Sequence, residues 1–131
     1  MPLFTKAERL CHQKSIDQIF AQAQFVSQNY LRLFFNVRNT ETDLPFPIQI
    51  AFSVPKRKFK HAVTRNRLKR QMREAYRLQK DTFYVQLNEK KIAANVVLVY
   101  MGKEKCDFVD LKLKLQQVFQ QLISKHEQFA G

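Results

Sequence analysis

The chain has 131 residues, 45% of them hydrophobic, and carries a formal net charge of +12. This length and composition predict one domain, residues 1–131, with a filled hydrophobic core, and they argue against intrinsic disorder. No apolar run approaches the roughly 20 residues that cross a bilayer, so we expect no membrane contact, and the positive charge predicts a polyanionic partner.

The N-terminal part of the chain predicts a short amphipathic helix. Ser15 and Gln18 have the spacing of a capping box, and the apolar residues that follow repeat at helical intervals. We therefore expect a helix over about residues 16–24. Thr5 and Glu8 form a weaker start signal of the same kind.

Two strands are predicted next. Alternate residues of segment 30–37 point to opposite faces, which places Phe34 on the face opposite Leu33. The polar segment 39–43 then reads as a turn, and a second strand follows over residues 48–54, where a proline ends it.

A long helix and a further strand and helix complete the chain. Residues 62–79 are predicted to form a helix with one apolar stripe, made of Leu68, Met72, Ala75 and Tyr76. Segment 96–100 is continuously apolar, as in a strand buried on both faces. Asp107 and Asp110 are placed to cap a final helix whose apolar face comprises Leu111, Leu115, Val118 and Leu122.

The positive charge is concentrated in residues 56–77. This segment holds ten basic residues and one acidic residue, Glu74, whereas the rest of the chain is nearly balanced. Successive helical residues are about 100° apart, so the arginines at 67, 70, 73 and 77, together with Asn66, fall away from the apolar stripe. We expect a helix that buries one side and shows a cationic face to a polyanion.

Residues 62–77 carry a specific resemblance. They read AVTRNRLKRQMREAYR, which resembles the signature of the bacterial ribonuclease P protein family. The hallmark Arg-Asn-Arg of that family corresponds here to Arg65, Asn66 and Arg67. The similarity extends upstream through the preceding strand and basic connection to Arg9, so it covers residues 9–77 at the level of motifs.

This resemblance implies the fold, an α+β, single-domain α-β-β-β-α-β-α sandwich with helices packed on a four-stranded sheet (the ribosomal protein S5 domain 2-like class). It also implies a left-handed βαβ crossover at the basic helix, although about 98% of such connections are right-handed.

The resemblance further implies that the chain is a subunit of a ribonucleoprotein that removes the 5′ leader of precursor tRNA. The protein would bind the catalytic RNA subunit and the precursor tRNA, with no obligate protein partner. The residues expected to bind the RNA subunit are Lys56, Arg57, Lys58, Lys60, His61, Arg65, Asn66, Arg67, Lys69, Arg70 and Arg73.

A cleft that holds the single-stranded leader in this family corresponds to Ile16, Phe20 and Phe34. Ile16 departs from the family, in which an aromatic residue is common at this position. An apolar stripe at helical spacing is also the pattern of ordinary core packing, so a leader-binding groove and the core both remain open for these three side chains.

No catalytic or metal-binding residue is predicted in the chain itself. Its eleven acidic residues are scattered without the motif of a metal-dependent nuclease, and its three histidines are isolated. The resemblance implies that the RNA subunit performs the chemistry, with Mg²⁺ bound mainly through that RNA and the substrate. Cys11 and Cys106 lack metal-site spacing, and the N-terminus lacks a secretory signal, which predicts reduced cysteines in a cytoplasmic protein.

Two other functions fit a basic helix. A ribosomal or ribosome-assembly protein would use the same cationic face to bind RNA, and this remains the main alternative. A DNA-binding regulator would need a closely preceding helix of the helix-turn-helix type, and the sequence predicts none.

Overall fold

The computed structural model describes residues 8–10, 13–22, 24–37, 46–103 and 106–130, the side chains of residues 15, 37 and 126–130 excepted. In chain order these residues form α1 (Gln13–Gln22), β1 (Phe25–Gln28), β2 (Leu31–Val37), β3 (Ile48–Ser53), α2 (Ala62–Glu89), β4 (Ala94–Tyr100) and α3 (Phe108–Ala130). This order confirms the α+β arrangement expected from the sequence.

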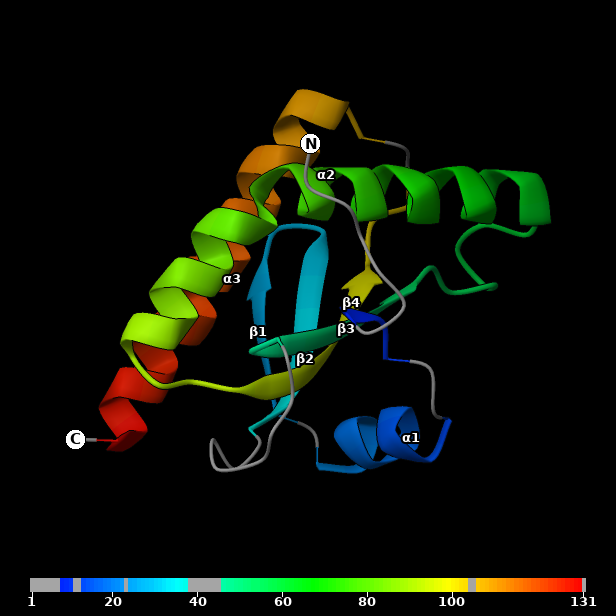
Figure 1. Ribbon diagram of the computed structural model, residues 1–131. Helices are drawn as coiled ribbons and strands as arrows, with labels where there is room; N and C mark the ends of the chain where they lie inside the picture. The colour runs from blue at the N-terminus through cyan, green and yellow to red at the C-terminus, as the bar shows by residue number, and fades with distance from the viewer. Residues whose placement is uncertain (1–7, 11–12, 23, 38–45, 104–105, 131) are drawn as a thin grey trace.

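The four strands form one mixed sheet in the order β1-β2-β4-β3. β1 pairs with β2, and β2 with β4, in the antiparallel sense, whereas β3 and β4 are parallel. Helices α2 and α3 pack on one face of the sheet, and α1 packs on the other (Figure 1). α2 therefore forms the predicted crossover between two parallel strands, and the left hand of that crossover stays a prediction.

The core lies between the sheet and the pair of helices α2 and α3. The predicted stripes are confirmed, because Leu68, Met72, Ala75 and Tyr76 of α2 and Leu111, Leu115, Val118 and Leu122 of α3 are all fully or almost fully buried. β4 is buried on both faces from Val96 to Tyr100. None of the described helices is long and apolar enough to span a membrane.

The first helix begins earlier than predicted. α1 starts at Gln13 and ends at Gln22, so Ser15 lies inside the helix and the capping box was wrong. The Gln13 amide donates to the Asp17 carboxylate 2.9 Å away, one turn further on, and such pairs stabilise a helix end. Thr5, Cys11, His12, His126 and the turn predicted over 39–43 lie outside the residues, or the side chains, that the structure describes.

α2 is ten residues longer than predicted. Its buried stripe continues through Lys80, Phe83 and Leu87, and the lysine at a core position hid this continuation. The helix ends in a Schellman motif, because the Ile92 amide donates to the Leu87 carbonyl, and Lys91 adopts the left-handed backbone conformation with φ of 58°. Glycine usually holds that position, so the sequence lacked the ordinary stop signal.

A buried ion pair fastens the N-terminal segment to α2. Lys80 is only 4% exposed, and its ammonium group donates to both Glu8 carboxylate oxygens at 2.7 Å. The Tyr84 hydroxyl donates to the same carboxylate at 2.6 Å, and the Tyr76 hydroxyl donates to Tyr84. Burial raises the pKa of both tyrosines, so these hydroxyls stay protonated. Residues 8–10 also cover the edge of β3, where the Leu10 amide donates to the Ile50 carbonyl.

α2 changes direction partway along its length, as Figure 1 shows. Its C-terminal half lies beside α3, and its N-terminal half runs away from α3. The Gln79 side-chain amide donates to the carbonyls of Ala75 in its own helix and Lys112 in α3. The second of these bonds connects α2 to the first turns of α3.

Candidate nucleic-acid interface

The loop that leads into α2 presents basic side chains on a fixed backbone. Lys56, Arg57, Lys60 and His61 are exposed. Between them, the half-buried Lys58 ammonium donates to the Met101 carbonyl, and the buried Phe59 ring contacts Tyr100 at 5.9 Å. These two contacts hold the loop against the end of β4, so its exposed cations have a defined position.

Arg65 has a structural role that the sequence did not reveal. Its guanidinium donates to the carbonyls of Phe59 and Lys60 at 2.8 Å each, and it is only partly exposed. Both bonds lie within the basic segment and connect the first turn of α2 to the preceding loop. We infer that Arg65 shapes this surface, and that its remaining N–H groups are available to a partner.

The outward face of α2 carries the predicted cationic array. Asn66, Arg67, Arg70 and Arg73 are exposed, and Lys69 is half-buried. The Arg73 guanidinium lies 5.9 Å from the centre of the Phe52 ring, within the range of a cation–π contact. Because the opposite face of the same turns is fully buried, these side chains project from a rigid support, which lowers the ordering cost of binding.

One acidic residue lies at the end of this array. The Arg77 guanidinium donates from Nε to the Glu74 carboxylate at 2.9 Å. This hydrogen bond lowers the pKa of the Glu74 carboxyl below its ordinary value. Arg77 therefore forms an ion pair within the helix. The exposed residues 66, 67, 70 and 73 form the part of the face that is directed at solvent.

A second group of residues lies on the opposite face of the sheet. Phe20 of α1 is 40% exposed, and its ring contacts the ring of Phe34 on β2 edge-to-face, with the centroids 4.9 Å apart. Ile16 and Phe34 are half-buried and pack beside the buried residues Ile19 and Val97. The structure brings the three predicted positions together, with Phe20 at the surface and the other two at its base.

Two further residues, which were not predicted from the sequence, extend this group. Phe25 of β1 is 37% exposed, and its ring lies 5.4 Å from that of Phe34. The Arg32 guanidinium lies 4.4 Å over the Phe25 ring. The alternation of β2 places Arg32 on the same face as Phe34, but β1 is only four residues long and was not located. We call Ile16, Phe20, Phe25, Arg32 and Phe34 the aromatic cluster.

No group of three or more His, Cys, Asp or Glu side chains in the described ranges is placed to hold a metal ion. Cys106 is half-buried and carries a free thiol. The described residues thus form two candidate binding surfaces. One is the cationic face of α2, and the other is the aromatic cluster with its arginine. Both are of the kind that binds RNA, by phosphate contacts and by stacking on unpaired bases.

Comparisons with known proteins identify relatives of the chain. A family model described as Ribonuclease P matches residues 4–126. The ribonuclease P protein component of Chlorobium phaeobacteroides is 32% identical over 119 residues, covering 86% of this chain and 81% of the relative. The protein of the same name from Porphyromonas gingivalis is 31% identical over 113 residues, with the same coverage of both chains.

Two solved structures have a similar fold. The RNase P protein from Thermotoga maritima superposes with a TM-score of 0.68 at 21% identity, covering 87% of this chain and 96% of that chain. The Staphylococcus aureus RNase P protein gives a TM-score of 0.67 at 19% identity, with coverage of 88% and 94%.

Proposed function

Because the chain belongs to the ribonuclease P protein family, we propose that it assists removal of the 5′ leader from precursor tRNA. It acts as a subunit that binds a catalytic RNA. The observation that carries this proposal is the exposed array of Asn66, Arg67, Arg70 and Arg73 on a helix whose other face is buried. The family membership favours this function over a ribosomal role.

The cationic surface is assigned to the RNA subunit. Arginine forks bind phosphate oxygens through two parallel hydrogen bonds, and an asparagine side chain both donates and accepts. The exposed loop residues Lys56, Arg57, Lys60 and His61 continue this surface beyond the helix. Lys58 and Arg65 support it through their contacts with backbone carbonyls. The half-buried Lys69 lies at its margin.

The aromatic cluster is assigned to the single-stranded leader of the substrate. Stacking of an unpaired base on an aromatic ring tolerates changes in base identity, which suits leaders of differing sequence. The exposed Phe20 ring beside Phe34 supports this role. The RNA subunit performs the cleavage of the leader, with Mg²⁺ held mainly by that RNA and the substrate. The complex acts in the cytoplasm.

The direct test adds the purified chain to its cognate RNA subunit and follows release of the leader from precursor tRNA. At low Mg²⁺ concentration we expect the chain to accelerate leader release, because its cations replace part of the charge screening that Mg²⁺ supplies. At high Mg²⁺ concentration the acceleration should shrink. Equal rates with and without the chain at low Mg²⁺ would contradict the proposed function.

Phe20→Ala and Phe34→Leu should each weaken binding of precursor tRNA to the holoenzyme about tenfold, since stacking on an aromatic side chain contributes on the order of 1 to 3 kcal/mol per base. Binding of mature tRNA, which has no leader, should not change. Leucine at position 34 keeps an apolar side chain beside α1, so the fold is preserved. Val85→Ala, at an exposed apolar position of α2, is the control, and equal losses for precursor and mature tRNA would refute the assignment.

A further inference from the structure

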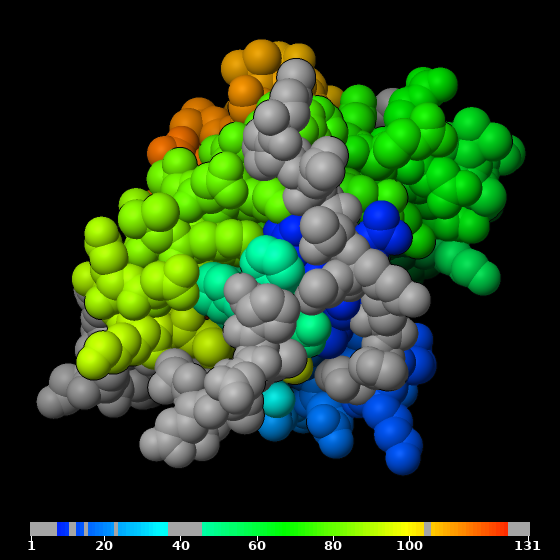
Figure 2. All heavy atoms as spheres, in the orientation of Figure 1, coloured from blue at the N-terminus to red at the C-terminus, as the bar shows by residue number. Residues whose placement is uncertain are grey.

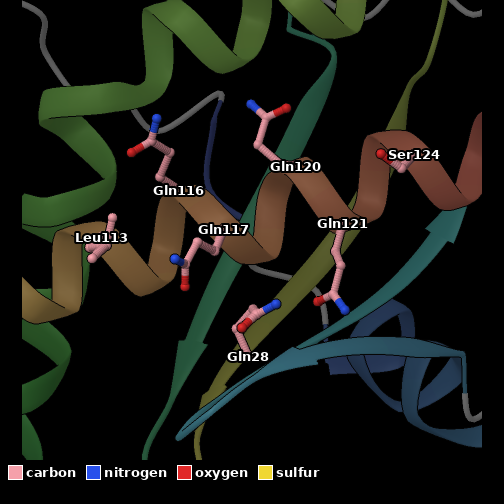
Figure 3. Close-up of a pocket in the computed structure, with 7 residues that line it drawn as sticks. All are labelled: Gln28, Leu113, Gln116, Gln117, Gln120, Gln121 and Ser124. Atoms are coloured by element: carbon pink, nitrogen blue, oxygen red, sulfur yellow. The ribbon is translucent and has the colours of Figure 1, made fainter.

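A groove runs between β1 and α3, away from the cationic face of α2. One cavity of about 570 Å³ is lined by Gln28, Leu113, Gln116, Gln117, Gln120, Gln121 and Ser124 (Figure 3). A second hollow of about 440 Å³ is lined by Phe25, Val26, Ser27, Gln121, Ser124 and Lys125. Gln121 and Ser124 line both, so the two hollows are adjacent, and together we call them the glutamine groove.

The groove is lined mostly by uncharged polar residues, with Lys125 as its one charged lining residue. Figure 3 shows the Gln117 and Gln121 side chains on the side of α3 that faces Gln28 of β1, whereas Gln116 and Gln120 point away from it. The Gln120 amide is engaged by Gln86 of α2 at 2.8 Å. A glutamine amide offers two N–H donors and a carbonyl acceptor, so three converging amides present donors and acceptors together without a fixed charge.

The groove is joined to the aromatic cluster through Phe25. This residue contacts the Phe34 ring and the Arg32 guanidinium on the α1 side of the sheet, and it also lines the second hollow. Lys125 lies at the same place, with its ammonium group 3.4 Å from the Phe25 carbonyl. A chain that leaves the aromatic cluster and crosses β1 therefore passes between two cations, Arg32 and Lys125.

The outer edge of β1 adds backbone groups to this crossing. The Phe35 amide donates to the Gln24 carbonyl, which fixes the register of the β1–β2 pair. Since hydrogen-bonded and non-hydrogen-bonded pairs alternate in an antiparallel ladder, Val26 and Gln28 bond to β2. The backbone groups of Phe25 and Ser27 consequently point outward, toward the groove.

We propose that single-stranded RNA follows this path: the 5′ leader continues from the aromatic cluster over the edge of β1 into the glutamine groove, where the amides hydrogen-bond to base edges. This inference rests on the proposed function and extends it to the distal part of the leader. Continuity with the stacking rings, the two cations at the crossing and the donor and acceptor amides all suit unpaired nucleotides, whose base edges are free to hydrogen-bond.

The test compares leaders of two lengths on the reconstituted holoenzyme, about 3 and about 20 nucleotides, which lie below and above the roughly 4–16 nucleotides that single-strand sites of other proteins span. Gln117→Ala combined with Gln121→Ala should weaken binding of the long-leader substrate about tenfold, because two hydrogen-bonding side chains are lost. Binding of the short-leader substrate should change less than about twofold. The control is Thr82→Ala with Asn88→Ala, which removes two exposed polar side chains of α2 that line neither hollow.

Several outcomes would overturn the proposal. The glutamine double variant could show no loss of substrate affinity with either leader, or the same loss of affinity with both leaders. The control variant could also lose as much affinity as the glutamine variant. A change of oligomeric state on sedimentation, without dependence on leader length, would show that the groove is a protein interface instead. Phe34→Leu is run in parallel: if it weakens binding of the long leader while the glutamine variant does not, the groove fails and the proposed function stands. Unchanged urea midpoints verify that the variants fold.

Discussion

Replacing Arg67 and Arg70 together by alanine is expected to weaken binding of the cognate RNA subunit by at least about 100-fold at moderate salt, because charge-assisted hydrogen bonds contribute about 1.5–3 kcal/mol each. Both side chains are exposed on the face of α2 opposite Leu68 and Met72. The free energy of unfolding should change by less than about 0.5 kcal/mol, as is usual for surface positions.

The salt dependence of the same variant identifies the kind of contact. Each phosphate contact releases counterions, and the logarithm of affinity falls with the logarithm of salt concentration by roughly 0.7 to 0.9 per contact. The double variant should therefore show a slope shallower by about 1.4–1.8. The control is Lys90→Ala with Lys91→Ala, which removes two exposed cations from the opposite end of α2. An unaltered slope in the arginine variant, or an equal change in the control, would contradict the assignment of this face.

Replacing Lys80 by methionine is expected to destabilise the fold by about 3–5 kcal/mol, because it removes one member of a buried ion pair. The Glu8 carboxylate is fully buried and would lose both of its 2.7 Å hydrogen bonds from the Lys80 ammonium group. The measurement is urea-induced unfolding of the isolated chain, followed by circular dichroism.

The informative comparison is the double variant Glu8→Met with Lys80→Met. Replacing both members of a buried pair by hydrophobic residues of similar volume is often close to neutral in stability, whereas removing one member is costly. We therefore expect the double variant to regain a large part of the lost stability. A Lys80→Met variant as stable as the parent, or a double variant less stable than the single one, would show that the pair does not hold residues 8–10 against α2.

Elements in which apolar residues repeat at a regular spacing were predicted well from the sequence. The α2 stripe and the β2 alternation follow from the spacing of apolar residues alone, and both hold in the structure. The missed part of α2 has a physical reason: Lys80 occupies a stripe position because its partner, Glu8, is 72 residues away. Periodicity carries no information on a contact between such distant residues. The end of α2 was missed as well, because the left-handed position of its Schellman motif holds Lys91 and not the glycine that usually marks a helix end.

The candidate site was predictable in composition and less so in detail. Charge patterning placed Arg67, Arg70 and Arg73 on an exposed face. The bonds of Arg65 to two loop carbonyls depend on the path of residues 59–60, which no local pattern specifies. The meeting of Phe20 and Phe34 came from the family resemblance, because helical and strand periods give the face of a residue and not its neighbour across the fold.

The most direct test of the central claim is to recover the chain from its own host under native conditions and to sequence the RNA that accompanies it. The account predicts that the RNA subunit of ribonuclease P is the dominant species, and that it is lost from the Arg67→Ala, Arg70→Ala variant. Recovery of ribosomal RNA in its place, retained by that variant, would contradict the account and favour a ribosomal role.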